Sequence, residues 1–214
     1  MTVRAYRPVS WQLPNATMPG VGTLQALRAE ALTCTRCPLA EGRTQVVFGI
    51  GDEAADLMLV GEGPGRQEDL RGEPFVGRSG QLLDTLLRQE LGMGREACYI
   101  ANVVKCRPPG NRDPLPAEIA ACRPYLQAQI ELIRPVVVVS LGNFATRLLL
   151  DTTEGITRLR GTVHRFGPGW LVPTYHPAAA LRGGTEVLAG MRADLVRAKR
   201  YLSVDPPAGD GPDR

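Results

Sequence analysis

Four of the five cysteines in this 214-residue chain are spaced as metal ligands would be. Cys34 and Cys37 are separated by two residues, which lets two thiolates on one tight loop bind the same metal centre. Cys106 and Cys122 follow further along the chain and complete the set. On spacing alone, four thiolates match a zinc site or an iron–sulfur cluster equally well. Cys98 lies in a predicted strand, where we expect it to pack in the core.

A second group of candidate residues lies in the glycine-rich segment GEGPGRQED, residues 61–69. Its glycines let backbone N–H groups approach a ligand closely. The spacing is GxGxG and no Walker lysine follows, so the segment does not fit the common nucleotide-binding motifs. Glu68 and Asp69 add carboxylates that can position or polarise water. Acidic residues are also common at helix starts, and that alternative stays open.

Three further side chains have the chemistry to bind a nucleobase. Phe75 stands in the loop GEPFVGRSG, where a ring can pack on the core or stack on a base. Asn102 interrupts an apolar strand, so its amide must cap a loop or read the edge of a pyrimidine. His176 follows another strand, whereas the second histidine, His164, is expected at the surface of a turn or hairpin. His176 is therefore the candidate general acid or electrostatic group.

The order of apolar runs and turn signals predicts how these residues are positioned. Short apolar runs predict buried parallel strands at residues 55–61, 98–104, 136–141 and 170–174. They alternate with predicted helices at residues 23–32, 80–90, 116–133, 142–150 and 186–202. This alternation predicts a three-layer α/β/α sandwich with a central four-stranded parallel sheet. Ligands of such sheets bind beyond the carboxyl ends of the strands, so one active site is expected there.

Composition and charge narrow the class of protein. Hydrophobic residues make up 43% of the chain, enough for a full core, and the length suits one domain. We expect an extended N-terminal arm at residues 1–22, a single domain at 23–202 and a disordered tail at 203–214. The net charge of +3 does not by itself indicate nucleic-acid binding. No signal peptide or membrane span is visible and the cysteines do not suggest disulfides, so we expect a cytoplasmic protein without membrane contact.

Several motifs together resemble family 4 of the uracil-DNA glycosylases, the iron–sulfur type found in bacteria and archaea. They are GEGPGRQED, GEPFVGRSGQLLD, YIANVVKCRPPGNRDP and YHPAAALR, and they occur in the family's order. With the four cysteines they cover residues 32–202. The resemblance implies the α/β/α fold and a structural [4Fe–4S] cluster bound by Cys34, Cys37, Cys106 and Cys122. It thereby favours iron–sulfur over zinc.

The resemblance also implies roles for the candidate base-binding residues. Phe75 would stack on uracil, Asn102 would read its O4/N3 edge, and His176 would support O2. The implied enzyme is a monofunctional uracil-DNA glycosylase of base excision repair, which flips uracil out of DNA and hydrolyses its N-glycosidic bond. Negative charge spreads over O2 as that bond stretches, and we expect His176 to stabilise it. The expected partner is uracil-containing DNA, single- or double-stranded, bound by a monomer.

The acidic residues of the first motif divide into two expected roles. Glu62 and Gly63 belong to the loop whose backbone would contact uracil. Glu68, with Asp69 adjacent, lies where the family's motif places a functional carboxylate, so both are expected to be catalytic. The motif departs from the family 1 enzymes, whose water-activating Asp and thymine-excluding Tyr are replaced here by Gly63 and Gly65. An Asp at that position therefore cannot activate the water, and Glu68 is the candidate for this role.

The residues after His176 are expected to contact DNA. The segment at residues 177–182 is predicted to be a loop along the minor groove. Leu181 would fill the gap left by the flipped base, and Arg182 would meet phosphate. The alternative for Leu181 is a leucine that covers the core.

Two other functions fit parts of the sequence. A non-catalytic iron–sulfur module that recognises DNA damage would bind uracil-containing DNA without releasing the base. The joint presence of Phe75, Asn102 and His176 speaks against it. A zinc-stabilised nucleotide hydrolase would need a phosphate-cleaving metal site, and no motif provides one. Release of uracil from an oligonucleotide separates the enzyme from both alternatives.

Overall fold

The strands form one mixed six-stranded sheet in the part of the chain that the computed structural model describes, residues 22–204. The order is β1-β3-β2-β4-β6-β5, with the strands β1 (Ile50–Gly51), β2 (Leu57–Gly61), β3 (Tyr99–Asn102), β4 (Val137–Leu141), β5 (His164–Phe166) and β6 (Gly169–Thr174). The four inner strands pair in parallel, which confirms the predicted central sheet. β1 and β5 pair antiparallel at the edges and were not predicted, because two or three residues are too few for a periodic signal.

The helices lie between the strands in the predicted alternation. They are α1 (Leu24–Leu32), α2 (Leu39–Gly42), α3 (Arg66–Arg71), α4 (Arg78–Leu86), α5 (Pro116–Ile133), α6 (Asn143–Leu150), α7 (Ile156–Leu159) and α8 (Pro177–Tyr201). Three short helical turns accompany them: η1 (Leu87–Leu91), η2 (Arg95–Ala97) and η3 (Pro109–Asn111). Within residues 22–204, none of the helices combines the length and apolar character needed to cross a membrane. The predicted arm and tail lie almost entirely outside the described residues.

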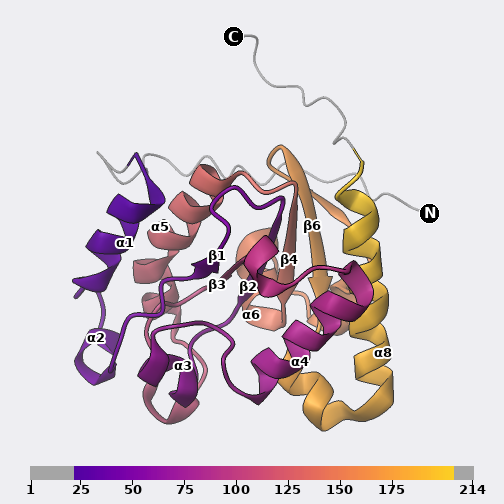
Figure 1. The fold of residues 1–214 in the computed structure, drawn as a ribbon. Coiled ribbons are helices and arrows are strands. Elements are labelled where there is room, and N and C mark those ends of the chain that lie inside the picture. Colours follow the sequence, from indigo (N-terminus) through magenta and orange to yellow (C-terminus); the bar gives the residue numbers. More distant parts are fainter. Residues whose placement is uncertain (1–21, 205–214) are drawn as a thin grey trace.

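Helices cover both faces of the sheet (Figure 1). On β2, Met58 and Val60 pack in one core cluster with α1, α5 and α6, whereas Leu57 and Leu59 pack in a second cluster with α4 and α8. Successive side chains of a strand point to opposite faces, so a wholly apolar strand requires a helical layer on each side. The predicted three-layer α/β/α sandwich is confirmed.

The segment after β6 differs from the prediction. α8 begins at Pro177, because proline suits the first helical position and the side chain of His176 accepts a hydrogen bond from the N–H group of Ala178. Gly184, with φ of +72°, interrupts the helix and separates a short first part from the long second part. The prediction of a loop at residues 177–182 is therefore wrong, and Leu181 and Arg182 lie on this first helical part.

Candidate functional site

One cavity at the carboxyl ends of the parallel strands collects the predicted base-binding residues. It has a volume of about 590 Å³, and Phe75, Asn102 and His176 all line it. They reach it from separate segments: the loop before α4, the end of β3 and the start of α8. The rings of Phe75 and His176 lie with their centroids 5.7 Å apart and their planes tilted by 32°. An aromatic ring, an amide and an imidazole therefore face one shared space.

The amide of Asn102 is buried and incompletely paired. Its side chain is 2% exposed, and its Oδ1 has no hydrogen-bond partner among the described residues. Gly61 ends β2 beside it, and a Cβ atom there would lie 2.5 Å from Oδ1 of Asn102 and 2.6 Å from Cζ of Phe75. Glycine at this position is what allows the amide and the ring to meet at the strand end. An orphaned buried acceptor is costly, unless a ligand supplies the missing donor.

The loop that carries Phe75 is held in an unusual conformation. The φ of Phe75 is +53°, which is rare for a residue with a Cβ atom. Oε1 of Glu68 accepts hydrogen bonds from the N–H groups of Val76 at 3.0 Å and Gly77 at 2.9 Å. Nη1 of Arg95 donates to the carbonyl oxygen of Phe75 at 3.2 Å. These contacts hold the backbone of the loop in place, and with it the ring of Phe75 in the wall of the cavity.

The two carboxylates expected to be catalytic lie in different places. Glu68 lines the cavity, although one of its oxygens is engaged in the loop. Asp69 is 3% exposed, and its Oδ1 accepts from the N–H groups of Thr44 at 2.9 Å and Gln45 at 3.4 Å. Asp69 does not line the cavity and instead ties α3 to the segment before β1. The structure thus brings only Glu68 of this pair to the site.

Glu62 is a titratable group in the same cavity, where Gly63 also lines the wall. Burial raises the pKa of Glu62 to about 7, and the nearby Asp113 carboxylate acts in the same direction. A carboxyl group with such a pKa exchanges a proton near neutral pH, as a general base does. The sequence placed Glu62 in the loop but gave no sign of this shift, because burial is a property of the fold.

His176 is held as a neutral imidazole. Burial lowers its pKa to about 4, the positive charge of Arg182 contributes to the lowering, and Glu68 opposes it. Its Nδ1 accepts the hydrogen bond from the N–H group of Ala178 at 3.1 Å. Because Nδ1 uses its lone pair, the single ring proton must be on Nε2. The ring is therefore a neutral hydrogen-bond donor through Nε2.

Arginine side chains surround the cavity. Arg182, predicted to contact phosphate, lines it together with three arginines that sequence analysis missed, Arg66, Arg78 and Arg112. Arg66 and Arg78 each follow a glycine at the start of a helix, and this repeated Gly-Arg helix start is a signal that could have identified them. Arginine binds phosphate with a planar set of donors. Leu181 is 45% exposed and lies outside the cavity lining.

The four predicted metal ligands line a second, small pocket. Cys34 and Cys37 lie between α1 and α2, Cys106 follows β3, and Cys122 lies in α5. Three small side chains leave room between the thiols: Ala31, Ala40 and Ala121. Within residues 22–204, no three Cys, His, Asp or Glu side chains are grouped as ligands of a metal ion. Cys98 is fully buried elsewhere and does not line the pocket.

Cationic and N–H donors surround these thiols. Nη1 of Arg43 lies 3.4 Å from Sγ of Cys106, and the backbone N–H of Lys105 donates to Sγ of Cys122 at 3.2 Å. Burial raises the pKa of the Cys106 thiol, and raises that of Cys122 to about 11. Thiols in this environment become thiolates only beside a positive centre, which is what a metal supplies. The donor set therefore fits a group bound by thiolates.

Lys105 connects the thiol pocket with the cavity. Its Nζ is buried and donates to the carbonyl oxygen of Asn102 at 2.8 Å and to Oε1 of Gln129 at 2.6 Å. Lys105 directly precedes Cys106 in the chain. The end of β3, which carries the buried amide, is thus attached through one side chain to helix α5.

The parallel inner strands, the cavity at their carboxyl ends and the thiol pocket define an α/β/α protein with a ligand cavity at the edge of its sheet. The sequence matches the family model of the Uracil DNA glycosylase superfamily over residues 48–199. It is 47% identical to a type-4 uracil-DNA glycosylase of Thermotoga maritima over 79% of this chain and 89% of the relative. A type-4 uracil-DNA glycosylase of Saccharolobus solfataricus is 42% identical over 86% of this chain and 88% of the relative. A type-5 enzyme of Mycobacterium bovis is 31% identical over 86% and 83%, respectively.

The chain belongs to the type-4 uracil-DNA glycosylases within this superfamily. The family predicted from the motifs is confirmed.

Proposed function

We propose that this protein removes uracil from DNA by hydrolysing the N-glycosidic bond, which releases free uracil and leaves an abasic site. The observation that carries the proposal is the buried amide of Asn102, whose Oδ1 lacks a partner at the wall of a cavity that Phe75 and His176 share. The names of its relatives, type-4 uracil-DNA glycosylases, support the same activity.

The Asn102 amide distinguishes uracil from cytosine. Its Oδ1 would accept from N3–H of uracil, while its Nδ2 would donate to O4. Cytosine presents the reverse pattern, an acceptor at N3 and an amino donor at position 4, so both contacts would be lost. A site built around such hydrogen bonds rejects the wrong base strongly, because its buried polar groups are then left unpaired. The ring of Phe75 would stack on the base and hold its edge against Asn102.

His176 provides the stabilisation of the leaving group. As the bond between C1′ and N1 stretches, negative charge develops on uracil O2 and positive charge on the sugar. The neutral imidazole would donate a hydrogen bond from Nε2–H to O2, because Nδ1 accepts from the N–H group of Ala178 and leaves the ring proton on Nε2. One such preorganised donor is worth about 2.7–4 kcal/mol of transition-state stabilisation.

A cavity carboxylate activates the water that attacks C1′. The sequence pointed to Glu68 for this role, and Glu68 does line the cavity. Its bonds to the loop of Phe75 favour Glu62 instead, because Glu62 has a pKa of about 7 and lines the same cavity. We therefore assign the water to Glu62, and to Glu68 the role of holding the Phe75 loop.

The start of α8 contacts DNA. A base inside a duplex must be rotated out before its glycosidic bond can be reached. The exposed side chain of Leu181 would enter the gap that the base leaves, and Arg182 would bind an adjacent phosphate. Arg66 and Arg78 extend the positive lining toward the phosphates of single- or double-stranded uracil-containing DNA, whereas the guanidinium of Arg112 is paired with the carboxylate of Glu118. We retain a monomer in the cytoplasm as the predicted state and location.

We further assign a [4Fe–4S] cluster to Cys34, Cys37, Cys106 and Cys122. The shared pocket, the small alanine side chains and the surrounding donors support this assignment. Four cysteine thiolates are the ligand set that such clusters take, and all four cysteines line this one pocket. When bound, the cluster supplies cross-links that stabilise the fold, and the base chemistry remains with the cavity residues.

An oligonucleotide panel tests the proposal. Anaerobically purified protein is incubated with otherwise identical strands that contain U, T, C or hypoxanthine. We expect free uracil from the U strand, and strand scission only after the product is treated to cleave abasic sites. T and C strands should remain intact. Tight binding of the U strand without release of base would instead identify the non-catalytic damage-binding module. Release of cytosine would overturn the role of Asn102, whereas release of thymine, which presents the same N3–H and O4 edge as uracil, would show that the cavity accepts the 5-methyl group.

A further inference from the structure

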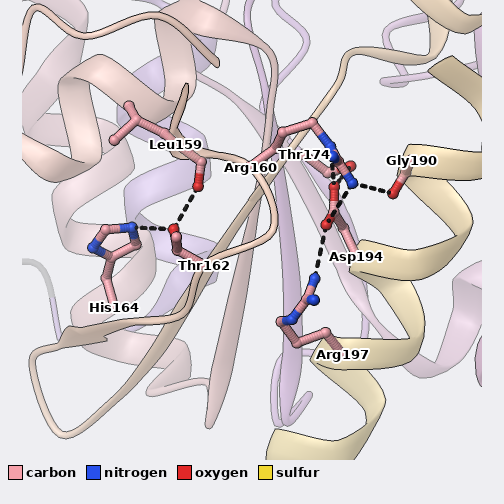
Figure 2. A network of polar contacts seen from close by, with 8 residues as sticks. All are labelled: Leu159, Arg160, Thr162, His164, Thr174, Gly190, Asp194 and Arg197. Atoms are coloured by element: carbon pink, nitrogen blue, oxygen red, sulfur yellow. Dashed lines mark hydrogen bonds and ion pairs between the residues drawn. The ribbon is translucent and has the colours of Figure 1, made fainter. Parts of the chain in front are cut away.

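A buried ion pair of Arg160 and Asp194 lies beside Thr174, the residue that ends β6 two positions before His176 (Figure 2). Asp194 of α8 has no exposed side-chain surface, and Arg160 contacts both of its oxygens, through Nε at 3.0 Å and Nη2 at 3.1 Å. Arg197 adds a third contact, from Nη1 to Oδ1 at 3.0 Å. Nη2 of Arg160 also donates to the carbonyl oxygen of Gly190 at 3.0 Å. The pair joins the segment after α7 to the middle of α8.

The same pair holds the two residues that precede His176. Thr174, the last residue of β6, donates its hydroxyl to Oδ2 of Asp194 at 2.9 Å. Tyr175 lies under the guanidinium of Arg160, whose Cζ is 5.3 Å from the centroid of the ring. The two residues before His176 are therefore each held by one member of the ion pair: Thr174 by Asp194, and Tyr175 by Arg160.

Glycine at position 190 is part of this arrangement. A Cβ atom there would lie 3.1 Å from Cζ of Arg160 and 3.1 Å from Cε2 of Tyr175. Both distances are tighter than ordinary contacts, so the absence of a side chain lets the guanidinium and the ring pack against α8.

The loop that carries Arg160 is fixed on its other side as well (Figure 2). The hydroxyl of Thr162 donates to the carbonyl oxygen of Leu159, so it must accept from Nε2–H of His164, which lies 2.7 Å away. These two hydrogen bonds tie together the residues on either side of Arg160. They support the position from which Arg160 contacts Asp194 and Tyr175.

Stability alone is a poor explanation for this arrangement. Charges taken out of water lose hydration, and well-packed apolar residues often stabilise a fold as well as a buried ion pair does. Burial raises the pKa of Asp194 against the opposing effects of Arg160, Thr174 and Arg197, which shows that desolvation of the carboxylate is substantial. A bidentate ion pair fixes the relative orientation of its two side chains better than apolar packing does.

We propose that Arg160 and Asp194 are positioning residues that orient His176 by fixing Thr174 and Tyr175. The backbone at His176 is then held in one conformation, in which the imidazole faces Phe75 and caps α8. The inference rests on the proposed role of His176 in uracil release. It adds that Arg160 and Asp194, which do not line the cavity, determine the orientation of the imidazole.

Three variants test this inference. Thr174→Val keeps the shape of the side chain and removes its bond to Asp194, and Arg160→Met removes the ion pair and the stacking on Tyr175. Arg197→Met is the matched control, because Arg197 contacts the same carboxylate but neither of the residues before His176. We expect single-turnover uracil release to fall about tenfold in the first two and less than about twofold in the control. Affinity for uracil-containing DNA should change little in all three.

A spectroscopic readout separates positioning from general loss of stability. The chain has two histidines, so the ¹⁵N signals of the His176 ring can be assigned by their loss in His176→Gln. Wild type and Arg197→Met should show one neutral tautomer with the proton on Nε2. Thr174→Val and Arg160→Met should show a mixture of tautomers or broadened signals at temperatures well below their unfolding.

The outcomes also separate this inference from the proposed function. Unchanged ring signals and unchanged rates in Thr174→Val would overturn the positioning role. The same holds if Arg197→Met loses as much activity as Arg160→Met. If His176→Ala keeps its activity while the tautomer shifts still occur, the proposed role of His176 fails, yet the structural link from Asp194 to the imidazole stands.

Discussion

The cavity and the thiol pocket lie only a few residues apart in the chain, and they are built in opposite ways. Asn102 ends β3 in the cavity, and Cys106 lines the pocket. The cavity has a large volume, charged walls and a buried acceptor without a partner. The pocket is small, and its thiols are accompanied by alanines, by Tyr125 and by cationic side chains such as Arg43 and Lys105. A site for a ligand that is released keeps polar groups free to bind it, whereas a site for a permanently bound group is lined by the side chains that hold that group.

The comparison between cavity and pocket shows which interactions maintain each region. In the cavity, the strained φ of Phe75 and the orphaned amide are maintained by surrounding contacts such as those of Glu68 and Arg95. In the pocket, binding of the proposed [4Fe–4S] cluster would itself contribute free energy to the fold. Changes in the two regions should therefore affect different quantities.

The largest expected effect is in the pocket. Cys106→Ser should lose iron and lower the free energy of unfolding by more than about 4 kcal/mol, because loss of a bound metal group belongs to the most destabilising changes. Iron content, visible absorption and thermal unfolding measure this. Cys98→Ala is the control, since Cys98 lies outside the pocket and should keep full iron content. A Cys106→Ser protein with normal iron would remove the assigned ligand set.

The next effect is in the cavity and should have the opposite signature. His176→Ala should reduce single-turnover uracil release about 10²–10³-fold, as removal of one preorganised donor does. Iron content and the visible spectrum should remain those of the wild type, because His176 does not line the pocket. Near-normal turnover of this variant would show that O2 is stabilised by another group.

Lys105→Met should affect both regions, because Lys105 joins them. It leaves the carbonyl oxygen of Asn102 and Oε1 of Gln129 without their buried donor, at about 1–3 kcal/mol for an unsatisfied group. We expect slower uracil release together with a lower unfolding temperature. Lys199, the second lysine, is exposed, so Lys199→Met is the matched control and should change neither quantity. Normal activity in Lys105→Met would mean that the two regions are independent.

The smallest effect concerns pH. Because the pKa of Glu62 is about 7, its ionised fraction rises between pH 6 and 8, and uracil release should rise about tenfold with it. His176 adds no inflection there, since its pKa of about 4 keeps it neutral. Glu62→Gln should abolish the pH dependence and lower the rate at pH 8. A pH profile that keeps its inflection near 7 in this variant would exclude Glu62 as the titrating group.

The same shift predicts a change in stability, with a defined sign. A raised carboxyl pKa means that the folded state holds the proton more tightly than the unfolded state, so stability falls as pH rises from about 4.5 to about 7. Glu62→Gln should therefore unfold at a higher temperature than the wild type above pH 7, and this advantage should disappear below pH 4.5. Thermal unfolding at a series of pH values measures the difference.

Much of the fold followed from apolar periodicity and turn residues. The inner strands and α5 were predicted because buried parallel strands are continuously apolar and because Pro116 marks a helix start. The edge strands β1 and β5 were missed because they are very short. The loop predicted after His176 was wrong because a helix can begin on an imidazole cap, which no propensity scale registers.

The candidate site was predictable where a residue type has few other uses. Cysteines and a lone amide in an apolar strand are of this kind, and the structure brings them to two common pockets. The separation of Glu68 from Asp69 was not predictable, because adjacent residues at a helix start can face opposite directions. The raised pKa of Glu62 and the buried bonds of Lys105 depend on packing between distant segments.

Glycine at position 184 divides α8 into two mechanical parts. The long part is fastened to the sheet by buried residues such as Asp194 and Leu195, whereas the short part begins on the imidazole of His176 and bears Leu181. The break at Gly184 separates the two parts of the backbone. In the proposed complex, the DNA strand beside Leu181 and the base beside His176 would therefore meet the same short helical segment.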